Sequence, residues 1–159
     1  MKYALATMVA FSTLASSLAA QETPIQGVDV EFELQDVESK VASEFWADLE
    51  GDLEAEIIKL VANRIAEDGS DISIDIDEFD VSKTFQGAIG VDSVLTGAVE
   101  VKNEGDTTKN SFYDLRVSVD EAAKLKRDGD GADLITHDRE DVYRAMVETF
   151  AEGVVKRLR

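Results

Sequence analysis

The sequence has 159 residues, of which 34 are Asp or Glu and 16 are Lys or Arg, and its formal net charge is −18. A protein surface with this excess of negative charge repels the phosphates of nucleic acids, which excludes a nucleic-acid-binding role. The chain contains no cysteine and only one histidine. Neither disulfide bonds nor a typical zinc site is therefore expected, and stability must come from an ordinary hydrophobic core.

Residues 1–19 are typical of a cleavable signal peptide. Lys2 gives a positive start, an apolar stretch follows, and small residues precede the end of the segment. Cleavage after Ala19 fits best, and cleavage after Ala20 is the alternative. An uncleaved anchor fits less well, because the span is barely long enough and is diluted by Ser and Thr. We expect a periplasmic or secreted protein with no stable membrane span and one mature domain, residues 20–159.

The first predicted strand follows a short lead-in. Residues 28–34 alternate strictly, with apolar side chains on one face and carboxylates on the other. Apolar residues then recur at helical spacing from Val37 onward, and the helix is expected to end at Asp68 and Gly69, where a left-handed glycine can close it. Gly51 lies inside this run. The sequence leaves open whether residues 37–68 form one helix or two.

Period-two alternation returns over residues 71–81, with isoleucines on the inward side and Asp and Ser on the outward side. The alternation breaks at Glu78 and Phe79, which predicts a β-bulge there. Two further strands, residues 91–101 and 111–119, are joined by a turn at residues 103–106 and predict a hairpin.

The C-terminal part contains a polar stretch and a final helix. Residues 120–133 are rich in Asp, Lys and Gly and contain a short helical piece over residues 121–126. Thr136 or Asp138 can cap a last helix whose apolar face includes Val142 and Phe150.

The element order β-α-β-β-β-α predicts an α+β fold. A single two-layer domain is expected, with a mixed four-stranded sheet and two helices on one face. The helix between the first two strands makes these strands parallel through a right-handed crossover. The other face of the sheet is then left to outward-pointing polar side chains.

A ladder of carboxylates on this uncovered face is the predicted interaction surface. Neighbouring strands lie about 4.8 Å apart, so the carboxylates repel one another unless something compensates them. Water and salt, the hairpin side chains of Lys102 and Arg116, a divalent cation or a basic partner are the candidates. The ladder consists of Asp29, Glu31, Glu33, Asp71, Asp75 and Asp77.

A second candidate is a calcium loop at residues 128–133. Asp128, Asp130 and Asp133 offer oxygen ligands at nearby positions, but the spacing of glycine and of the final acidic ligand departs from the EF-hand pattern. His137 lies next to Asp138 without a second histidine or a cysteine in the chain, so a surface or capping role is expected for it.

No motif in the sequence names a reaction. The leading hypothesis is a non-enzymatic exported domain that binds a basic protein or a cell-envelope component through its acidic surface, without a cofactor. The alternative is a divalent-cation-binding protein, with calcium as the ligand. A hydrolase that uses paired carboxylates is the second alternative, although in so acidic a chain some pair matches any separation.

Overall fold

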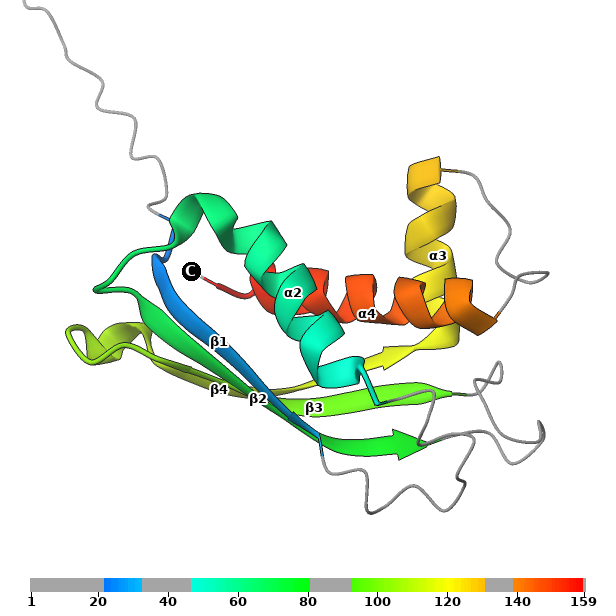
Figure 1. Ribbon diagram of the computed structural model, residues 1–159, viewed down its shortest axis with the longest axis horizontal. Helices are drawn as coiled ribbons and strands as arrows, with labels where there is room; N and C mark the ends of the chain where they lie inside the picture. The colour runs from blue at the N-terminus through cyan, green and yellow to red at the C-terminus, as the bar shows by residue number, and fades with distance from the viewer. Residues whose placement is uncertain (1–21, 33–46, 81–92, 131–138, 159) are drawn as a thin grey trace, which may run out of the picture.

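The computed structural model describes residues 22–32, 47–80, 93–130 and 139–158 (Figure 1). The elements in chain order are β1 (Ile25–Phe32), α2 (Leu49–Val61), the 3-10 turn η2 (Ala62–Arg64), β2 (Ser70–Asp80), β3 (Val94–Lys102), the 3-10 turn η3 (Thr107–Lys109), β4 (Ser111–Ser118), α3 (Val119–Asp130) and α4 (Arg139–Val155).

The four strands form one mixed sheet in the order β1-β2-β3-β4. β1 runs parallel to β2, whereas β2 with β3 and β3 with β4 are antiparallel. α2 and α4 lie on the same face of the sheet, and α3 stands at the end of β4, where it packs against α4 (Figure 1). The predicted α+β fold with a mixed four-stranded sheet is therefore confirmed.

The residues that alternate between buried and exposed along the strands are the predicted ones. Ile72, Ile74 and Ile76 of β2 are buried against the helices, while the residues between them are exposed. The register between β2 and β3 shifts between Asp75 and Glu78, where the sequence predicts a bulge. Period two therefore gives the correct inward face of β2 as far as Ile76, the last residue of this strand whose side chain is described.

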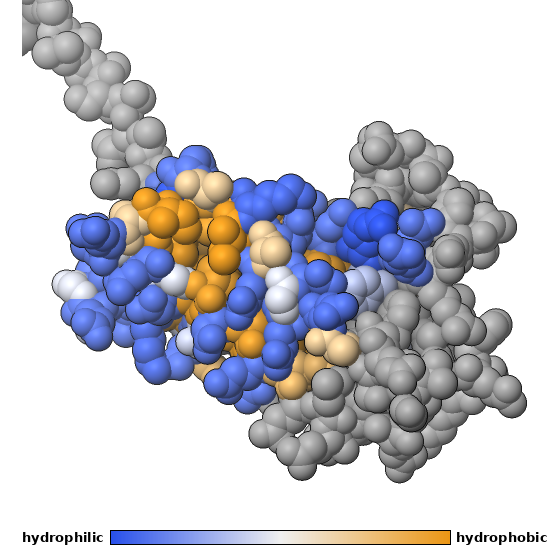
Figure 2. Space-filling view, in the orientation of Figure 1, coloured by the Kyte–Doolittle hydropathy of each residue, from blue (hydrophilic) through white to orange (hydrophobic). Residues whose placement is uncertain are grey.

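The long predicted helix is only partly described. α2 continues through Gly51 without a break, and the fully buried side chains of Leu49, Leu53, Ile57 and Val61 form its core-facing stripe. Residues 37–46, the first part of the predicted helix, lie outside the described residues. Figure 2 shows hydrophilic side chains over most of the described surface, with an apolar strip where α2 and β1 lie side by side.

The predicted end of this helix at Asp68 and Gly69 is wrong. After η2, Ile65 is extended and forms a parallel bridge with Ile25, and the N–H of Ala66 donates to the Ile25 carbonyl at 2.9 Å. Pairing with β1 replaces further helical turns. Gly69 does not close a helix with a left-handed backbone. A Cβ there would lie 2.4 Å from the carbonyl carbon of Ile25, so glycine is required by this close approach.

The helix α3 is longer than the short piece expected over residues 121–126. Ser118 Oγ accepts from the N–H of Glu121 at 3.2 Å, and a Glu121 carboxylate oxygen accepts from the N–H of Ser118 at 3.0 Å. This reciprocal capping box satisfies two donors at the start of the helix. The helix continues through Asp128 and Asp130, where the sequence analysis expected a loop.

α4 approaches the sheet closely at Gly97 in β3. A Cβ at Gly97 would lie 2.9 Å from Ile76 Cδ1 and 3.2 Å from Phe150 Cζ. Phe150 is fully buried and lies at the centre of the core, together with Met146 on the same helix. The missing side chain at Gly97 therefore makes room for the largest ring in the core.

Replacing Gly97 by valine should destabilise the fold. The added methyl groups overlap Ile76 and Phe150, and overpacking of this kind costs about 1–3 kcal/mol. Urea unfolding followed by circular dichroism measures the loss. Gly51→Ala is the control, because nothing lies within 4 Å of a Cβ there, and alanine should raise the free energy of unfolding by about 0.5–1 kcal/mol. An unchanged urea midpoint for Gly97→Val would contradict the described packing.

Candidate functional site

The open face, defined as the sheet face opposite α2 and α4, carries the predicted carboxylate ladder. Asp29 and Glu31 of β1 and Asp71 and Asp75 of β2 are exposed there. Glu33 lies outside the described residues, and so does the side chain of Asp77. Four of the six residues are thus brought together on neighbouring strands.

Strand register sets the neighbours on the open face. Glu31 lies directly beside Asp75, which is opposite Ala98 of β3. One row along, Asp29 lies beside Ser73, which is opposite Glu100. Because paired residues of adjacent strands lie about 5 Å apart at Cβ, these rows concentrate negative charge across three strands.

Little of this charge is neutralised inside the described part of the chain. Lys102 Nζ lies 2.7 Å from Glu100 Oε2, so this lysine does compensate one carboxylate. Arg116 is opposite Thr96 and forms no ion pair with described residues. Within the described ranges, Asp29, Glu31 and Asp75 likewise form none.

An aromatic ring stands at the border of the ladder. Phe112 of β4 lies opposite Glu100, and 70 % of its surface is exposed. It lines a shallow depression of about 400 Å³ together with Asp29, Glu31, Ser73, Asp75 and Glu100. The sequence analysis missed Phe112 because it followed the inward residues of this strand. The sequence does contain a signal for it, because Phe112 precedes the inward residue Tyr113 and must therefore point outward in an alternating strand.

The metal hypothesis gains no site from the described residues. No group of three or more His, Cys, Asp or Glu side chains among them is placed to hold a metal ion. The backbone at Asp128 and Asp130 is helical, whereas Asp133 and His137 lie outside the described residues. The calcium site at residues 128–133 stays a prediction.

A second polar cluster joins α2 to α4. Tyr143 Oη donates to Asp52 Oδ2 at 2.6 Å, beside a cavity of about 580 Å³ that is also lined by Asp48, Lys59 and Glu148. Burial raises the pKa of Tyr143 well above its ordinary value, and the hydrogen bond to Asp52 and the charges of Asp52 and Asp48 raise it further. This phenol is a helix-to-helix link that keeps its proton at neutral pH.

Comparison of the sequence with models of known protein families finds no match, and comparison with curated proteins finds none either. Among the helices of the described ranges, none combines the length and the apolar character needed to cross a bilayer.

The Tyr143 link should make stability fall at alkaline pH. The unfolded chain loses the phenolic proton near pH 10, while the folded chain retains it because its pKa is raised. The contribution is complete below pH 10 and is lost above it, by at most about 1.4 kcal/mol per pH unit. Urea unfolding between pH 8 and 11 should show a shallower loss for Tyr143→Phe than for the wild-type protein. Identical slopes would contradict this assignment.

Proposed function

We propose that the protein is an exported, non-enzymatic interaction domain whose open face binds a basic protein or a basic cell-envelope component. Export is proposed from the signal-like residues 1–19, which lie outside the described part of the chain. A periplasmic or secreted location follows from that segment.

One observation carries the binding proposal: carboxylates of three neighbouring strands line a depression together with the exposed ring of Phe112, on a face that no described helix covers. Glu31 and Asp75 are direct neighbours, and Asp29 and Glu100 belong to the adjoining row. A Lys or Arg side chain that enters the depression meets carboxylates and the face of an aromatic ring together, and both attract cations.

The spread of the charges favours an extended partner. A metal ion needs several oxygen atoms within about 2.5 Å, whereas these carboxylates follow the strand spacing across the face. A chain with several cationic side chains can meet several of them at once. The net charge of −18 also accelerates the encounter with such a partner.

The same geometry gives less support to carboxylate-pair hydrolysis. An acid and a base of this type need unlike environments inside a water-excluding pocket. Glu31 and Asp75 are both exposed in a shallow depression. Binding is therefore the function that this face supports best.

Removing three charges from the open face should weaken binding of a basic probe. In the open-face variant, Asp29→Asn, Glu31→Gln and Asp75→Asn remove exposed carboxylates without changing side-chain size. Each exposed pair contributes about 0.2–1 kcal/mol, so affinity should fall about tenfold. The measurement is fluorescence anisotropy with a labelled ten-residue peptide of alternating Lys and Ser.

A matched control removes the same number of charges elsewhere. Glu67→Gln, Asp68→Asn and Glu104→Gln change exposed side chains outside the open face, so only the long-range field weakens. Equal losses of affinity in the two triple variants would show that the peptide senses net charge alone, and the proposed site would be rejected.

Phe112 should contribute through its ring. Phe112→Ala is expected to lower affinity for the same peptide about two- to fivefold, because a cation over an exposed ring contributes about 0.5–1 kcal/mol. Ile58→Ala on α2 is the comparison, since this side chain is also exposed, at 44 %, but lies on the other side of the sheet. If both variants bind like the wild-type protein, the ring has no part in the site.

A further inference from the structure

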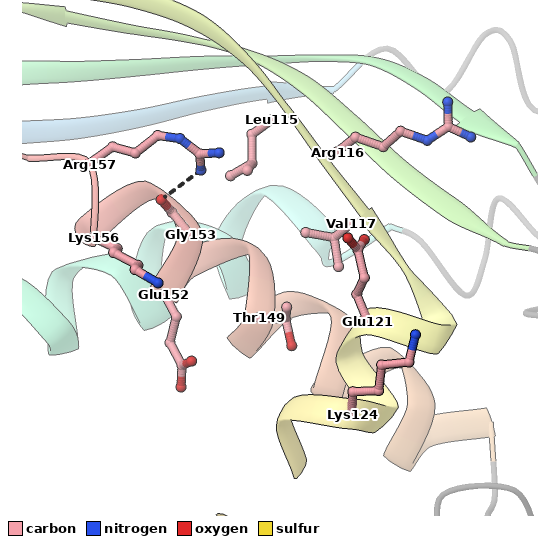
Figure 3. A pocket seen from close by; sticks show the side chains of 10 residues that line it. All are labelled: Leu115, Arg116, Val117, Glu121, Lys124, Thr149, Glu152, Gly153, Lys156 and Arg157. Carbon is pink, nitrogen blue, oxygen red and sulfur yellow. Dashed lines mark hydrogen bonds between the residues drawn. The ribbon is translucent and has the colours of Figure 1, made fainter. Parts of the chain in front are cut away.

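A groove runs along the free edge of β4, between this strand, the start of α3 and the C-terminal half of α4 (Figure 3). Its volume is about 630 Å³. Leu115 extends from β4 toward α4, where Gly153 offers only backbone, while Arg116 extends to the other side of the strand. Val117 and Thr149 complete a largely apolar floor.

Unpaired backbone groups border this groove. The N–H of Ser118 donates to the Glu121 side chain, and the N–H of Val119 donates to Ser93 at the start of β3. Because backbone groups alternate in direction along a strand, those of residues 112, 114 and 116 point the same way as those of Ser118, away from β3. The N–H groups of these three residues donate to no described partner.

The opposite edge of the sheet is different. On β1, the N–H of Val30 donates to Glu54 Oε1 at 3.2 Å, and the N–H of Phe32 donates to Glu50 Oε1 at 2.8 Å. Two side chains of α2 therefore occupy the donors that an added strand would need there. Edges treated in this way resist pairing, whereas an uncovered edge is a template for another strand.

The groove is lined by charges of both signs, with four cationic side chains and two carboxylates, those of Glu121 and Glu152. Within the described residues, Lys156 and Arg157 line the groove and form no ion pair, and neither does Arg116 at its border, whose side chain extends to the other side of β4. Arg157 donates to the Gly153 carbonyl and lies over the ring of Tyr113 at 5.2 Å. The remaining Lys and Arg residues with described side chains are each paired with a carboxylate: Lys59, Arg64, Lys102, Lys109, Lys124 and Arg144.

We infer that the β4 edge binds an extended, acidic segment of another protein as a fifth strand of the sheet. Backbone pairing with residues 112, 114 and 116 supplies the hydrogen bonds, as in other cases of strand addition. Alternate side chains of the segment enter the groove, where carboxylates meet Lys156 and Arg157. This site lies beyond the open-face function and has the opposite charge preference.

An acidic protein segment fits this edge better than a second copy of the chain or a nucleic acid. A second copy of the chain would bring the same three cations to the shared edge, since an isologous interface meets itself. A nucleic acid has no backbone donors and acceptors spaced to match a strand. Repulsion of an acidic segment by the net charge is screened beyond about 8 Å at physiological salt, whereas contacts inside the groove are not.

The test uses a fluorescein-labelled ten-residue peptide of alternating Asp and Val, titrated against the mature protein in 150 mM NaCl. Asp114→Pro removes an edge donor that has no described partner, so the fold should tolerate it, while affinity should fall about tenfold. Lys156→Glu should lower affinity about fivefold. Lys59→Glu, with the same change of net charge on α2, should alter it less than about twofold.

Backbone pairing is tested through the peptide itself. N-methylation at all Asp positions or at all Val positions removes the donors on one edge of the peptide, so only one of the two modified peptides should lose binding. The inference is overturned if the wild-type protein does not bind the Asp-Val peptide, if both methylated peptides bind equally, or if Lys59→Glu weakens binding as much as Lys156→Glu. Light scattering measures the oligomeric state. A dimer that Asp114→Pro converts to a monomer would show that the edge binds a second copy of the chain, and this result would also overturn the inference.

Discussion

One-sided burial of the sheet is the constraint on which the rest of the molecule depends. The isoleucines of β2 and the valines and leucines of its neighbours are buried under α2 and α4, with Phe150 seated over Gly97. Many of the alternate residues are charged, and covering them with a helix would require removing water from carboxylates that have no described partner. The same alternation that builds the core therefore leaves the opposite face of the sheet uncovered by any described helix.

Two surfaces of opposite charge follow from this arrangement and meet at β4. The open face presents Asp29, Glu31 and Asp75 with Phe112 at their border, while the groove behind the strand presents more cations than carboxylates over an apolar floor. Arg116 and Asp114 stand on the border, on the open side of the same strand. Because β4 is an edge strand, its backbone is available to a partner in addition to its two rows of side chains.

Local pattern was enough to predict the strands, their inward faces, the bulge and the fold class, because each depends on periodicity within a few residues. The end of α2 was not predictable from local pattern, since the pairing of Ile65 with Ile25 joins distant segments. The length of α3 was underestimated, although the capping box formed by Ser118 and Glu121 can be recognised in the sequence. The groove cations were missed because whether a lysine is ion-paired depends on tertiary neighbours.

The carboxylates of Glu50 and Glu54 on α2, which accept from N–H groups of β1, have a consequence for assembly. A sheet whose two edges can both pair with another strand can assemble head to tail into a filament, since each added molecule exposes a new unpaired edge. Here the β1 edge is occupied by two glutamate side chains of the same chain. Strand addition at β4, as proposed, therefore leaves no second receptive edge at β1, where two side chains of α2 already accept from the N–H groups of Val30 and Phe32.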